Sequence, residues 1–288
     1  RMPATSTFFF LQARSNIKNT VQCMKLLVGR QFNHPDVQAE LARQPYTGAE
    51  LPGGGVGIKI QYDGEDMVIS AEHCLAMCLV RAMGIASGAN GGVAIGDSVL
   101  AVPASFTDAQ RRGIMHACEI ASLNCLKITN ENNAVALSYG IFKSAKKLFS
   151  ETDKENYMFI DLGYSQYCVT VASFKQGNMS ILSTVCETIG GRNYDSFVVE
   201  YLCEVFEKKT KINVRDNKKA MLKLQVAAEK AKKTLSPNGV KEAPINVECL
   251  AEDIDLNCMI TKDEFNSRTQ SINDRLVPPI QQALKEAG

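Results

Sequence analysis

Residues 157–171 of the chain read YMFIDLGYSQYCVTV. A short apolar run ends on the carboxylate of Asp161, and Gly163 follows two residues later, ahead of a second β-prone run over Tyr167–Val171. This order predicts a strand, a tight turn and a second strand, with a carboxylate and a glycine at the tip. Backbone N–H groups in such a turn attract anions, and a carboxylate beside them can hold a hydrated Mg²⁺. The segment therefore predicts half of a phosphate clamp; the alternative is an ordinary hairpin whose turn carries Asp and Gly.

The composition of the 288-residue chain predicts a globular protein with two domains or one large bilobal domain. Hydrophobic residues make up 45% of the chain, which is ordinary for a protein with a packed core. Charges of both signs are mixed, and a net charge of +1 gives no footprint for nucleic acid or an anionic membrane. No apolar stretch is long enough to span a bilayer and no signal peptide is visible, so we expect a cytoplasmic protein.

Ten cysteines are scattered singly along the chain. Several of them, such as Cys125 and Cys168, stand inside apolar runs, which is typical of small buried side chains. This placement and the chain length argue against a disulfide framework and favour a reducing compartment. Cys74 and Cys78 are four residues apart on an expected helix. We expect both to pack in the core, because no second ligand pair follows at zinc spacing.

Residues 1–150 are predicted to form a first lobe with α/β organisation. The expected elements are helices over 16–31, 70–85 and 134–142, a helix that begins near residue 108, and strands over 56–62, 98–102 and 123–128. Thr107 and Gln110 have the spacing of a capping box, and Ser70 is expected to start the second helix.

Residues 151–288 are predicted to form the second lobe, after an exposed charged linker over 143–155. The elements expected after the first hairpin are strands over 179–184, 245–249 and 254–258, helices over 193–209 and 218–235, and a last helix capped by Thr261. The whole pattern predicts two α/β lobes, with no tandem repeat of short period.

Further candidate residues stand at the ends and in the middle of these elements. Glu131 lies in a polar segment between a strand and a helix, where such sheets place ligands; the alternative is a helix-capping carboxylate. Lys25 has apolar neighbours in the first expected helix, so it either extends to solvent or reaches a phosphate. Gly190 and Gly191 precede a helix N-terminus and offer a second backbone approach to phosphate.

One helix face carries four polar residues with offsets of 0, 3, 4 and 7, namely Glu229, Lys232, Lys233 and Ser236. The alkyl stems of such a face could stack on a flat base, and the Glu229 carboxylate could bind a ribose. The alternative is a solvated surface of paired charges. The three histidines have no serine or cysteine nucleophile at a recognisable spacing, so a hydrolase triad receives little support.

A longer stretch, VLAVPASFTDAQRRGIMHACEIASLNCLKITNENNAVALSYG over Val99–Gly140, resembles the core of the ATPase domain of seventy-kilodalton heat-shock chaperones. The resemblance extends over nearly the whole chain, through NTVQCMKLLVGRQF, FIDLG, ETIGGRNYD and AAEKAKKTLS. It implies the bilobal actin-like ATPase fold, which is ribonuclease-H-like and here truncated at both ends, with nucleotide between the lobes.

Two departures resemble the large, hundred-and-ten-kilodalton branch of this superfamily. The hairpin reads Asp161-Leu162-Gly163-Tyr164-Ser165-Gln166 where the chaperones usually carry Asp-Leu-Gly-Gly-Gly-Thr. The segment Asn130-Glu131-Asn132-Asn133 stands where they carry Asn-Glu-Pro-Thr. Members of the large branch act as nucleotide-exchange factors and holdases for their smaller relatives. The resemblance therefore implies a smaller heat-shock chaperone as partner, and unfolded client proteins bound through domains outside this chain.

The same resemblance implies ATP or ADP as ligand, with Mg²⁺. Lys25 corresponds to a lysine near the γ-phosphate, and Glu131 and Asp161 to carboxylates that hold Mg²⁺ through water. The positions implied to line the phosphates are Gly163, Tyr164, Ser165, Gln166, Gly190 and Gly191. Those implied to hold adenosine are Glu229, Lys232, Lys233 and Ser236.

Two parts of the family's cleft are missing from this sequence, an Asp-Leu-Gly-Thr loop ahead of Arg1 and a Gly-Gly-x-x-Arg loop after Gly288. We expect this fragment to bind ATP weakly or not at all, and the full protein to bind it. Tyr164 and Gln166 replace a glycine and a threonine, and loss of one donor to a developing charge costs about 3 kcal/mol of barrier. We therefore expect a weak ATPase at most, with ATP acting as a conformational ligand. The alternatives are an ATP-hydrolysing chaperone and, more remotely, a small-molecule kinase or filament protein of the same fold.

Overall fold

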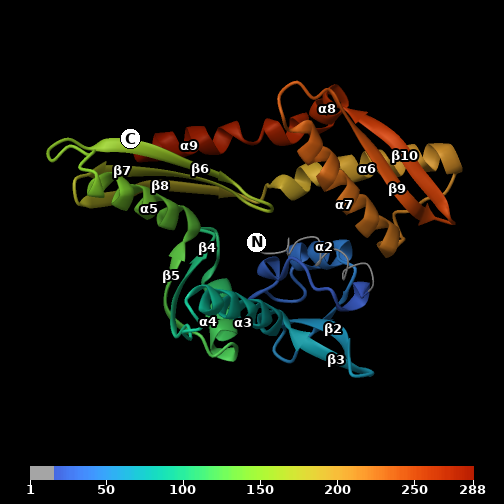
Figure 1. The fold of residues 1–288 in the computed structure, drawn as a ribbon, viewed down its shortest axis with the longest axis horizontal. Coiled ribbons are helices and arrows are strands. Elements are labelled where there is room, and N and C mark those ends of the chain that lie inside the picture. The colour runs from blue at the N-terminus through green and yellow to red at the C-terminus, as the bar shows by residue number, and fades with distance from the viewer. Residues whose placement is uncertain (1–15) are drawn as a thin grey trace. The chain divides into compact units, whose positions relative to one another are not determined.

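The computed structural model describes residues 16–288 and divides the chain into two compact units. Residues 16–102 together with Phe106–Thr129 form unit 1, and Pro103–Ser105 together with Asn130–Gly288 form unit 2 (Figure 1). The lobe boundary expected at residue 150 stays a prediction. Among the described residues, no helix combines the length and the apolar character that a bilayer crossing requires.

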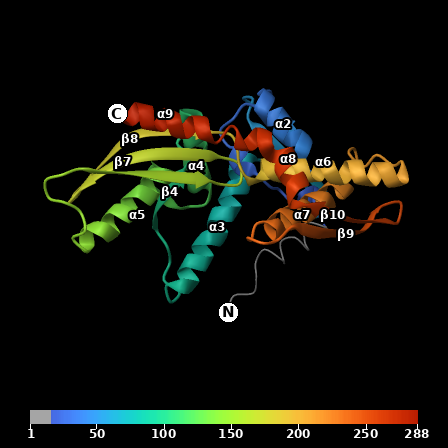
Figure 2. The same ribbon diagram turned by 90° about the horizontal axis from the view of Figure 1, so that it is seen from above.

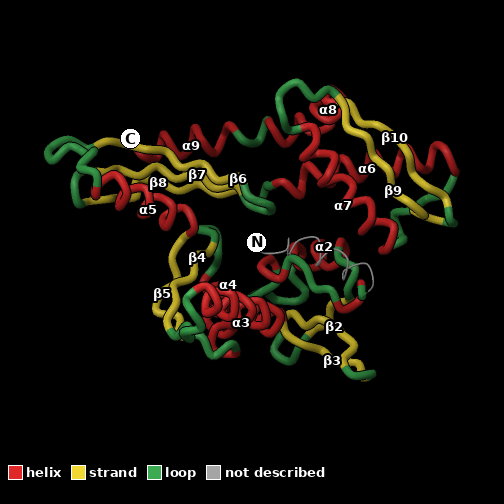
Figure 3. The backbone as a smooth tube through the Cα atoms, in the orientation of Figure 1, coloured by secondary structure: helices red, strands yellow, loops and turns green. Residues whose placement is uncertain are grey.

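Unit 1 contains two small sheets and the helices that cover them (Figure 3). Its elements are η1 (Ile17–Asn19), η2 (Met24–Leu26), α2 (Pro35–Arg43), β1 (Thr47–Glu50), β2 (Val56–Tyr62), β3 (Glu65–Ser70), α3 (Ala71–Ala89), β4 (Asp97–Val102), α4 (Asp108–Ile120) and β5 (Asn124–Asn130). Strands β1, β2 and β3 form an antiparallel sheet, and β4 pairs with β5.

The prediction of a helix over residues 16–31 is wrong, because the structure has two single-turn 3₁₀ helices, η1 and η2, in this region. Cys23 adopts a left-handed conformation with φ of 57°, and Gly29 has φ of 68°. A right-handed helix cannot continue through such residues. The backbone between them turns so that Leu27 and Val28 are fully buried in the core of unit 1. Tertiary packing therefore overrides the local helical pattern.

The expected starts of α3 and α4 are confirmed. The Ser70 hydroxyl accepts a hydrogen bond from the backbone N–H of His73, and Thr107 and Gln110 form the capping box. On α3, Cys74 is buried as expected, but Cys78 is exposed, so the prediction that both pack in the core is wrong for Cys78. The buried residues of α3 are Ala71, Cys74 and Ala76, so Cys78 lies beyond the turns of the helix that carry buried residues, although it shares a face with Cys74.

Unit 2 contains the predicted strand–turn–strand. Its elements are α5 (Glu131–Ala145), β6 (Glu155–Leu162), β7 (Tyr167–Lys175), β8 (Asn178–Glu187), α6 (Gly191–Thr210), α7 (Lys218–Leu235), β9 (Glu242–Ala251), β10 (Ile254–Thr261), α8 (Lys262–Asn273) and α9 (Val277–Ala287). Strands β6, β7 and β8 form an antiparallel meander, and β9 and β10 form a separate hairpin.

The central strand β7 is covered on both faces, by α9 on one side and α5 on the other (Figures 1 and 2). Val169 and Val171 pack with Ala283 of α9, whereas Ala172 and Phe174 pack on the side of α5. Eight of the nine residues of β7 are buried. This explains why the β7 sequence reads as a continuous apolar and small-residue run rather than an alternating one.

Most residues of the charged segment 143–155 are exposed, as its composition predicted, but the segment is also anchored to the rest of unit 2. Helix α5 continues to Ala145, and the Lys143 ammonium lies 5.2 Å from the centre of the Tyr157 ring. Phe149 is buried, and its ring stacks on Phe174 with centroids 5.2 Å apart. The Phe149 ring anchors the segment to the sheet, which its charge alone did not indicate.

A second core of unit 2 joins α6 and α7 to the β9–β10 hairpin. The largest fully buried side chains in it are Leu202, Phe206, Leu224, Leu235, Leu256 and Ile260. The apolar stripe expected along α7 is confirmed, since Leu224, Ala228 and Ala231 all face this core.

Two glycines in unit 1 mark a close approach between η2 and α4. A Cβ at Gly113 would lie 2.8 Å from the Val28 side chain and 2.9 Å from the backbone nitrogen of Gly29. A Cβ at Gly29 would lie 2.4 Å from the carbonyl oxygen of Ala109. Backbone packs directly on backbone here, so neither position has room for a side chain.

We predict that Gly113→Ala destabilises unit 1 by about 1–3 kcal/mol, because the added methyl overpacks this contact. Gly84→Ala is the matched control, since Gly84 lies on the exposed face of α3 with nothing within 4 Å of the new Cβ. Its helical propensity gain is about 0.8–1 kcal/mol. Urea unfolding of the two variants measures both effects, and equal midpoints would contradict the packing argument.

Candidate functional site

The β6–β7 turn, residues 163–166, lies at the tip predicted from the sequence. The Gly163 amide donates to the carbonyl oxygen of Gln166 over 2.8 Å, which closes the turn. Asp161 is exposed on the last residues of β6, and the Tyr164 side chain is 58% exposed. The turn therefore presents its backbone and one carboxylate to solvent.

The segment Gly190–Gly191 packs directly against this turn. The Gly191 amide donates to the carbonyl oxygen of Gly163, and the Arg192 amide donates to that of Tyr164, each over 2.9 Å. A Cβ at Gly190 would lie 2.3 Å from the carbonyl carbon of Tyr164. The structure thus brings together the two backbone segments singled out in the sequence, and we call residues 163–166 with Gly190 and Gly191 the turn cradle.

The two amides at the start of α6 are therefore used within the protein. In this structure the N–H of Gly191 supports the turn, and the N–H of Gly190 donates to the Asn193 side chain over 3.0 Å. The expected phosphate contacts of Gly190 and Gly191 stay a prediction. The geometry shows a β6–β7 turn whose shape is fixed by hydrogen bonds from the N-terminus of α6.

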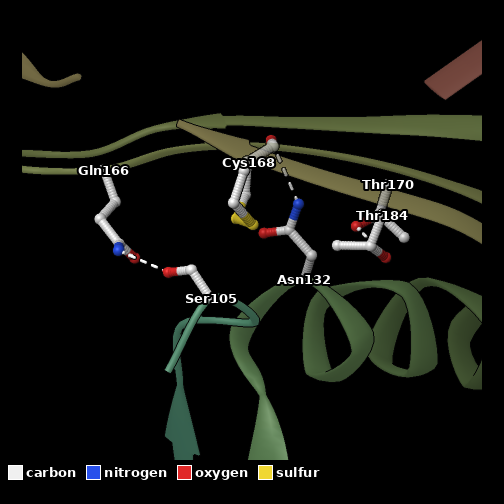
Figure 4. The surroundings of a disulfide bond; sticks show 7 residues. Ser105, Asn132, Gln166, Cys168, Thr170 and Thr184 are labelled. Atoms are coloured by element: carbon white, nitrogen blue, oxygen red, sulfur yellow. Dashed lines mark hydrogen bonds between the residues drawn. A yellow bond between two sulfur atoms is a disulfide. The ribbon is translucent and has the colours of Figure 1, made fainter. Parts of the chain in front are cut away.

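The start of α5 lies at the same end of the sheet as the turn cradle. Glu131 is the first residue of α5, and the Asn132 amide group donates to the carbonyl oxygen of Cys168 over 3.2 Å (Figure 4). Cys168 is paired with Asp161 in the β6–β7 register. The two predicted carboxylates, Asp161 and Glu131, are thereby placed at one rim of unit 2.

Three buried amide oxygens near this rim, in Asn132, Asn133 and Gln166, accept no hydrogen bond from the residues that the structure describes. The Gln166 amide nitrogen, by contrast, donates to the Ser105 hydroxyl over 2.7 Å (Figure 4). Leaving a buried acceptor unsatisfied costs about 1–3 kcal/mol. The exposed Asp161 and the half-buried Glu131 at this rim supply carboxylate oxygens, which Mg²⁺ prefers, so the residues present fit a Mg²⁺ held through water. Across residues 16–288 there is no group of three or more His, Cys, Asp or Glu side chains that could hold a metal alone.

The predicted polar face of α7 is engaged in two separate ion pairs. The Lys232 ammonium lies 2.6 Å from a carboxylate oxygen of Asp195 and 3.1 Å from the carbonyl oxygen of Gly191. Lys233 pairs with Glu229 over 2.6 Å, one helical turn away. Ser236 caps the C-terminus of α7. Only Lys232 thus reaches the turn cradle, and the adenosine role of this face stays a prediction.

Asp195 is a functional candidate that sequence reasoning missed. Burial raises the pKa of its carboxyl group, and the neighbouring Lys232 ammonium opposes that rise. The pair ties α7 to the first turns of α6, directly behind the turn cradle. The only sequence signal was the position of Asp195 at the end of the ETIGGRNYD segment. A single Asp on a helix carries no partner information by itself.

Lys25 lies on η2 in unit 1 and is half-buried. The turn cradle belongs entirely to unit 2. The phosphate role expected for Lys25 therefore stays a prediction.

A single disulfide joins Cys168 to Cys186 among the described residues, a pairing that the argument against a disulfide framework did not anticipate. The two residues are directly opposite each other in the β7–β8 register, with Cα atoms 4.2 Å apart. The other eight cysteines of residues 16–288 carry no disulfide. The apolar surroundings of Cys168 did predict its burial, but the pairing depends on the register of two strands, which the sequence around one cysteine does not specify.

Comparison with known proteins places these features in a family context. The family model described as Hsp70 protein matches residues 11–288. The chain is 37% identical to heat shock 70 kDa protein 4L of Homo sapiens over 96% of its length, and 40% identical to heat shock protein hsp88 of Neurospora crassa over the same share. It is also 36% identical to heat shock 70 kDa protein 14 of Arabidopsis thaliana over 95% of its length. The aligned regions cover 33%, 38% and 32% of these relatives, so the chain spans about a third of their length.

We predict that Gly190→Ala destabilises unit 2 by about 1–3 kcal/mol. The new methyl group would clash with backbone atoms of the turn, which cannot move aside as a flexible side chain can. Gly163→Ala is the matched control in the same turn cradle, because its Cβ would approach no atom closer than 3.4 Å, at the Gln166 carbonyl oxygen. Thermal unfolding measures the difference. A Gly190→Ala variant as stable as the Gly163→Ala variant would show that the helix start does not press on the turn.

Proposed function

The chain belongs to the Hsp70 protein family, and from this premise we propose that it is the greater part of the nucleotide-binding domain of a large heat-shock chaperone. The resemblance found in the sequence is confirmed by the family model and by the heat-shock relatives. The mixed α/β structure, with several small sheets, is consistent with the actin-like ATPase fold of this family. Membership implies that ATP or ADP is the ligand.

The turn cradle is the observation that carries the proposed nucleotide role. A tight turn that presents backbone to solvent beside a carboxylate suits an anionic phosphate chain. We propose that Asp161 and Glu131 hold Mg²⁺ through water, and that residues 163–166 line the phosphates. When bound, the metal would neutralise phosphate charge. The Lys232–Asp195 pair and the start of α6 would keep the turn in one shape, which lowers the cost of ordering it on binding.

The side chains of the turn favour a binding role over rapid hydrolysis. The Tyr164 ring stands where the chaperones have a glycine, and the Arg192 guanidinium lies 6.0 Å from its centre, within cation–π range. The Gln166 amide nitrogen is directed to Ser105. A transition state for phosphoryl transfer needs donors preorganised around the developing charge. We propose that ATP acts here mainly as a conformational ligand and that hydrolysis is weak.

The biological role that we propose is nucleotide exchange on a smaller heat-shock chaperone, together with the holding of unfolded clients. The support is the similarity to large heat-shock proteins and the two departures at Tyr164 and Asn132-Asn133. Client binding would use parts of the protein outside this chain. The nearly balanced composition, with a net charge of +1, supports a protein partner rather than nucleic acid or membrane. We propose a cytoplasmic location.

The exchange role predicts that the full-length protein accelerates release of labelled ADP from a smaller chaperone that has been preloaded with it. Release would be followed by stopped-flow fluorescence, with and without ATP bound to the protein. An unchanged release rate would contradict the exchange-factor proposal. Steady phosphate release by the protein alone, abolished by Asp161→Asn, would instead favour an ATP-hydrolysing chaperone.

The nucleotide role predicts that Asp161→Asn in the full-length protein weakens Mg²⁺-dependent ATP binding about tenfold, equal to roughly 1.4 kcal/mol. Asp253→Asn is the matched control, because Asp253 is an exposed residue at the tip of the β9–β10 hairpin with φ of 57°. Asn tolerates this conformation as well as Asp does. Calorimetric titration gives both affinities, and equal loss in the two variants would remove Asp161 from the binding site.

A further inference from the structure

The Cys168–Cys186 disulfide is unlike the rest of the chain, in which the other eight cysteines among residues 16–288 form no disulfide. A chain built for an oxidising compartment would pair more of its cysteines. In a reducing compartment, where most cysteines stay as thiols, a disulfide is usually transient and serves catalysis or redox sensing. The composition therefore argues that this bond is reversible rather than a permanent staple.

The position of the bond links it to the turn cradle. Cys168 follows Gln166 by two residues, and Cys186 precedes Gly190 by four. The backbone amides of Gly191 and Arg192 donate to the carbonyl oxygens of Gly163 and Tyr164, so hydrogen bonds join the same two segments beyond the disulfide. The disulfide thus fixes the base of both backbone segments that form the turn cradle.

The sheet holds the two sulfur atoms together in either oxidation state. Next along the ladder, Val169 pairs with Val185 and Thr170 with Thr184, whose hydroxyl oxygens lie 3.1 Å apart (Figure 4). Cys168 and Cys186 stay opposite each other as long as this ladder persists. Their thiols are therefore held at a high effective concentration, and the bond can form and break without backbone rearrangement.

The Asn132 side chain next to Cys168 can interact differently with a thiol and with a disulfide. Figure 4 shows the Asn132 side chain pointing toward Cys168, with its amide oxygen on the side of the sulfur atoms. That oxygen accepts no hydrogen bond among the described residues, whereas the amide nitrogen donates to the Cys168 carbonyl. A disulfide has no proton to donate, but a thiol is a weak donor. Reduction thus supplies a donor beside an acceptor that lacks one, at the second residue of α5.

Three buried thiols of the chain are poor competitors for exchange with this bond. Burial raises the pKa of Cys74, Cys118 and Cys203 to about 11, so their thiolate fractions are small near neutral pH. Cys186 is half-buried and Cys168 only 7% exposed, so the Cys186 sulfur is the more accessible point of attack.

We propose that Cys168 and Cys186 form a reversible redox site whose co-substrate is a dithiol reductant, and that its reduction loosens the turn cradle. One thiolate of the dithiol attacks the Cys186 sulfur, which forms a mixed disulfide and releases Cys168 as a thiolate that takes up a proton. The second thiol of the reductant then attacks the reductant sulfur that is bonded to Cys186. This closes the reductant's own disulfide and releases Cys186 as a thiolate, which also takes up a proton. Two electrons and two protons pass to the chain, and the dithiol becomes a disulfide.

The effect on the turn cradle follows from the lost cross-link. With the bond reduced, the strand ends that carry Gln166 and Glu187 lose their covalent link and are held by noncovalent contacts alone, namely the backbone ladder, the Gln166–Ser105 hydrogen bond and the Glu187–Arg275 ion pair. The turn then opens more often, and its amides exchange faster with solvent. A more mobile turn is less preorganised for phosphate, so ATP binding weakens on reduction; this consequence alone rests on the proposed function.

The test starts from the purified protein equilibrated in oxidised and reduced dithiothreitol at stepped ratios. Alkylation followed by mass spectrometry reports the thiol state of each cysteine. We expect Cys168 and Cys186 to become alkylated together while the other eight cysteines stay reactive or protected as before. Failure of this pair to oxidise at any ratio would overturn the proposal.

Hydrogen exchange is then measured on peptides that cover residues 161–168 and 184–193, with the β9–β10 hairpin as internal reference. Reduction is expected to speed exchange in the two peptides about tenfold and to leave the hairpin unchanged. Cys168→Ser with Cys186→Ser should show the fast rates under all conditions, and Cys249→Ser, at an exposed cysteine, should behave as the unmodified chain. Equal rates in both redox states would overturn the proposal, whatever the serine variants show.

ATP titration of both redox forms separates this inference from the proposed function. Weaker binding of the reduced form, by about threefold to tenfold, supports the link between the redox site and the turn cradle. Equal binding by both forms would overturn that link. Absence of binding in both forms of the full-length protein would contradict the proposed function, and the exchange result would still decide the redox proposal.

Discussion

The amides at the start of α6 donate hydrogen bonds to the carbonyl oxygens of the β6–β7 turn, and the arrangement of unit 2 follows from this contact. The contact requires a glycine at position 190, since a side chain there would meet the turn backbone. It also uses amide groups that would otherwise be unpaired at a helix N-terminus. The ion pair between Lys232 and the buried Asp195 lies behind the same contact, so displacement of the α6 N-terminus would leave the Asp195 carboxylate without its partner.

Much of this site was predictable because its determinants are local. The turn at Gly163, the glycines before α6 and the capped start of α4 each depend on a few adjacent residues whose backbone preferences are strong. The family resemblance then supplied the fold, which no single segment could. The helix expected over residues 16–31 failed because a left-handed Cys23 and the burial of Leu27 and Val28 are set by distant partners.

The parts that escaped prediction are pairings between distant residues. The Cys168–Cys186 bond joins residues 18 apart, and Lys232 meets Asp195 and Gly191 from 37 and 41 residues away. These contacts depend on strand register and on how the helices pack. A shift of either element by one residue would change which side chains meet. The exposed Cys78 and the buried Phe149 show the same limit, because a helical stripe or a charged stretch gives only the average burial of its members.

The double covering of β7 has a mechanical consequence. A strand buried on both faces cannot slide by one residue, since every side chain would then point to the wrong layer. The hydrogen bonds from Tyr167 to Leu276 and from Ser183 to Ala283 add fixed points along the α9 side. At roughly 3.3 Å per residue, β7 is a stiff rod about 30 Å long. A push on α9 would therefore be transmitted along this rod as a rigid displacement toward the β6–β7 turn.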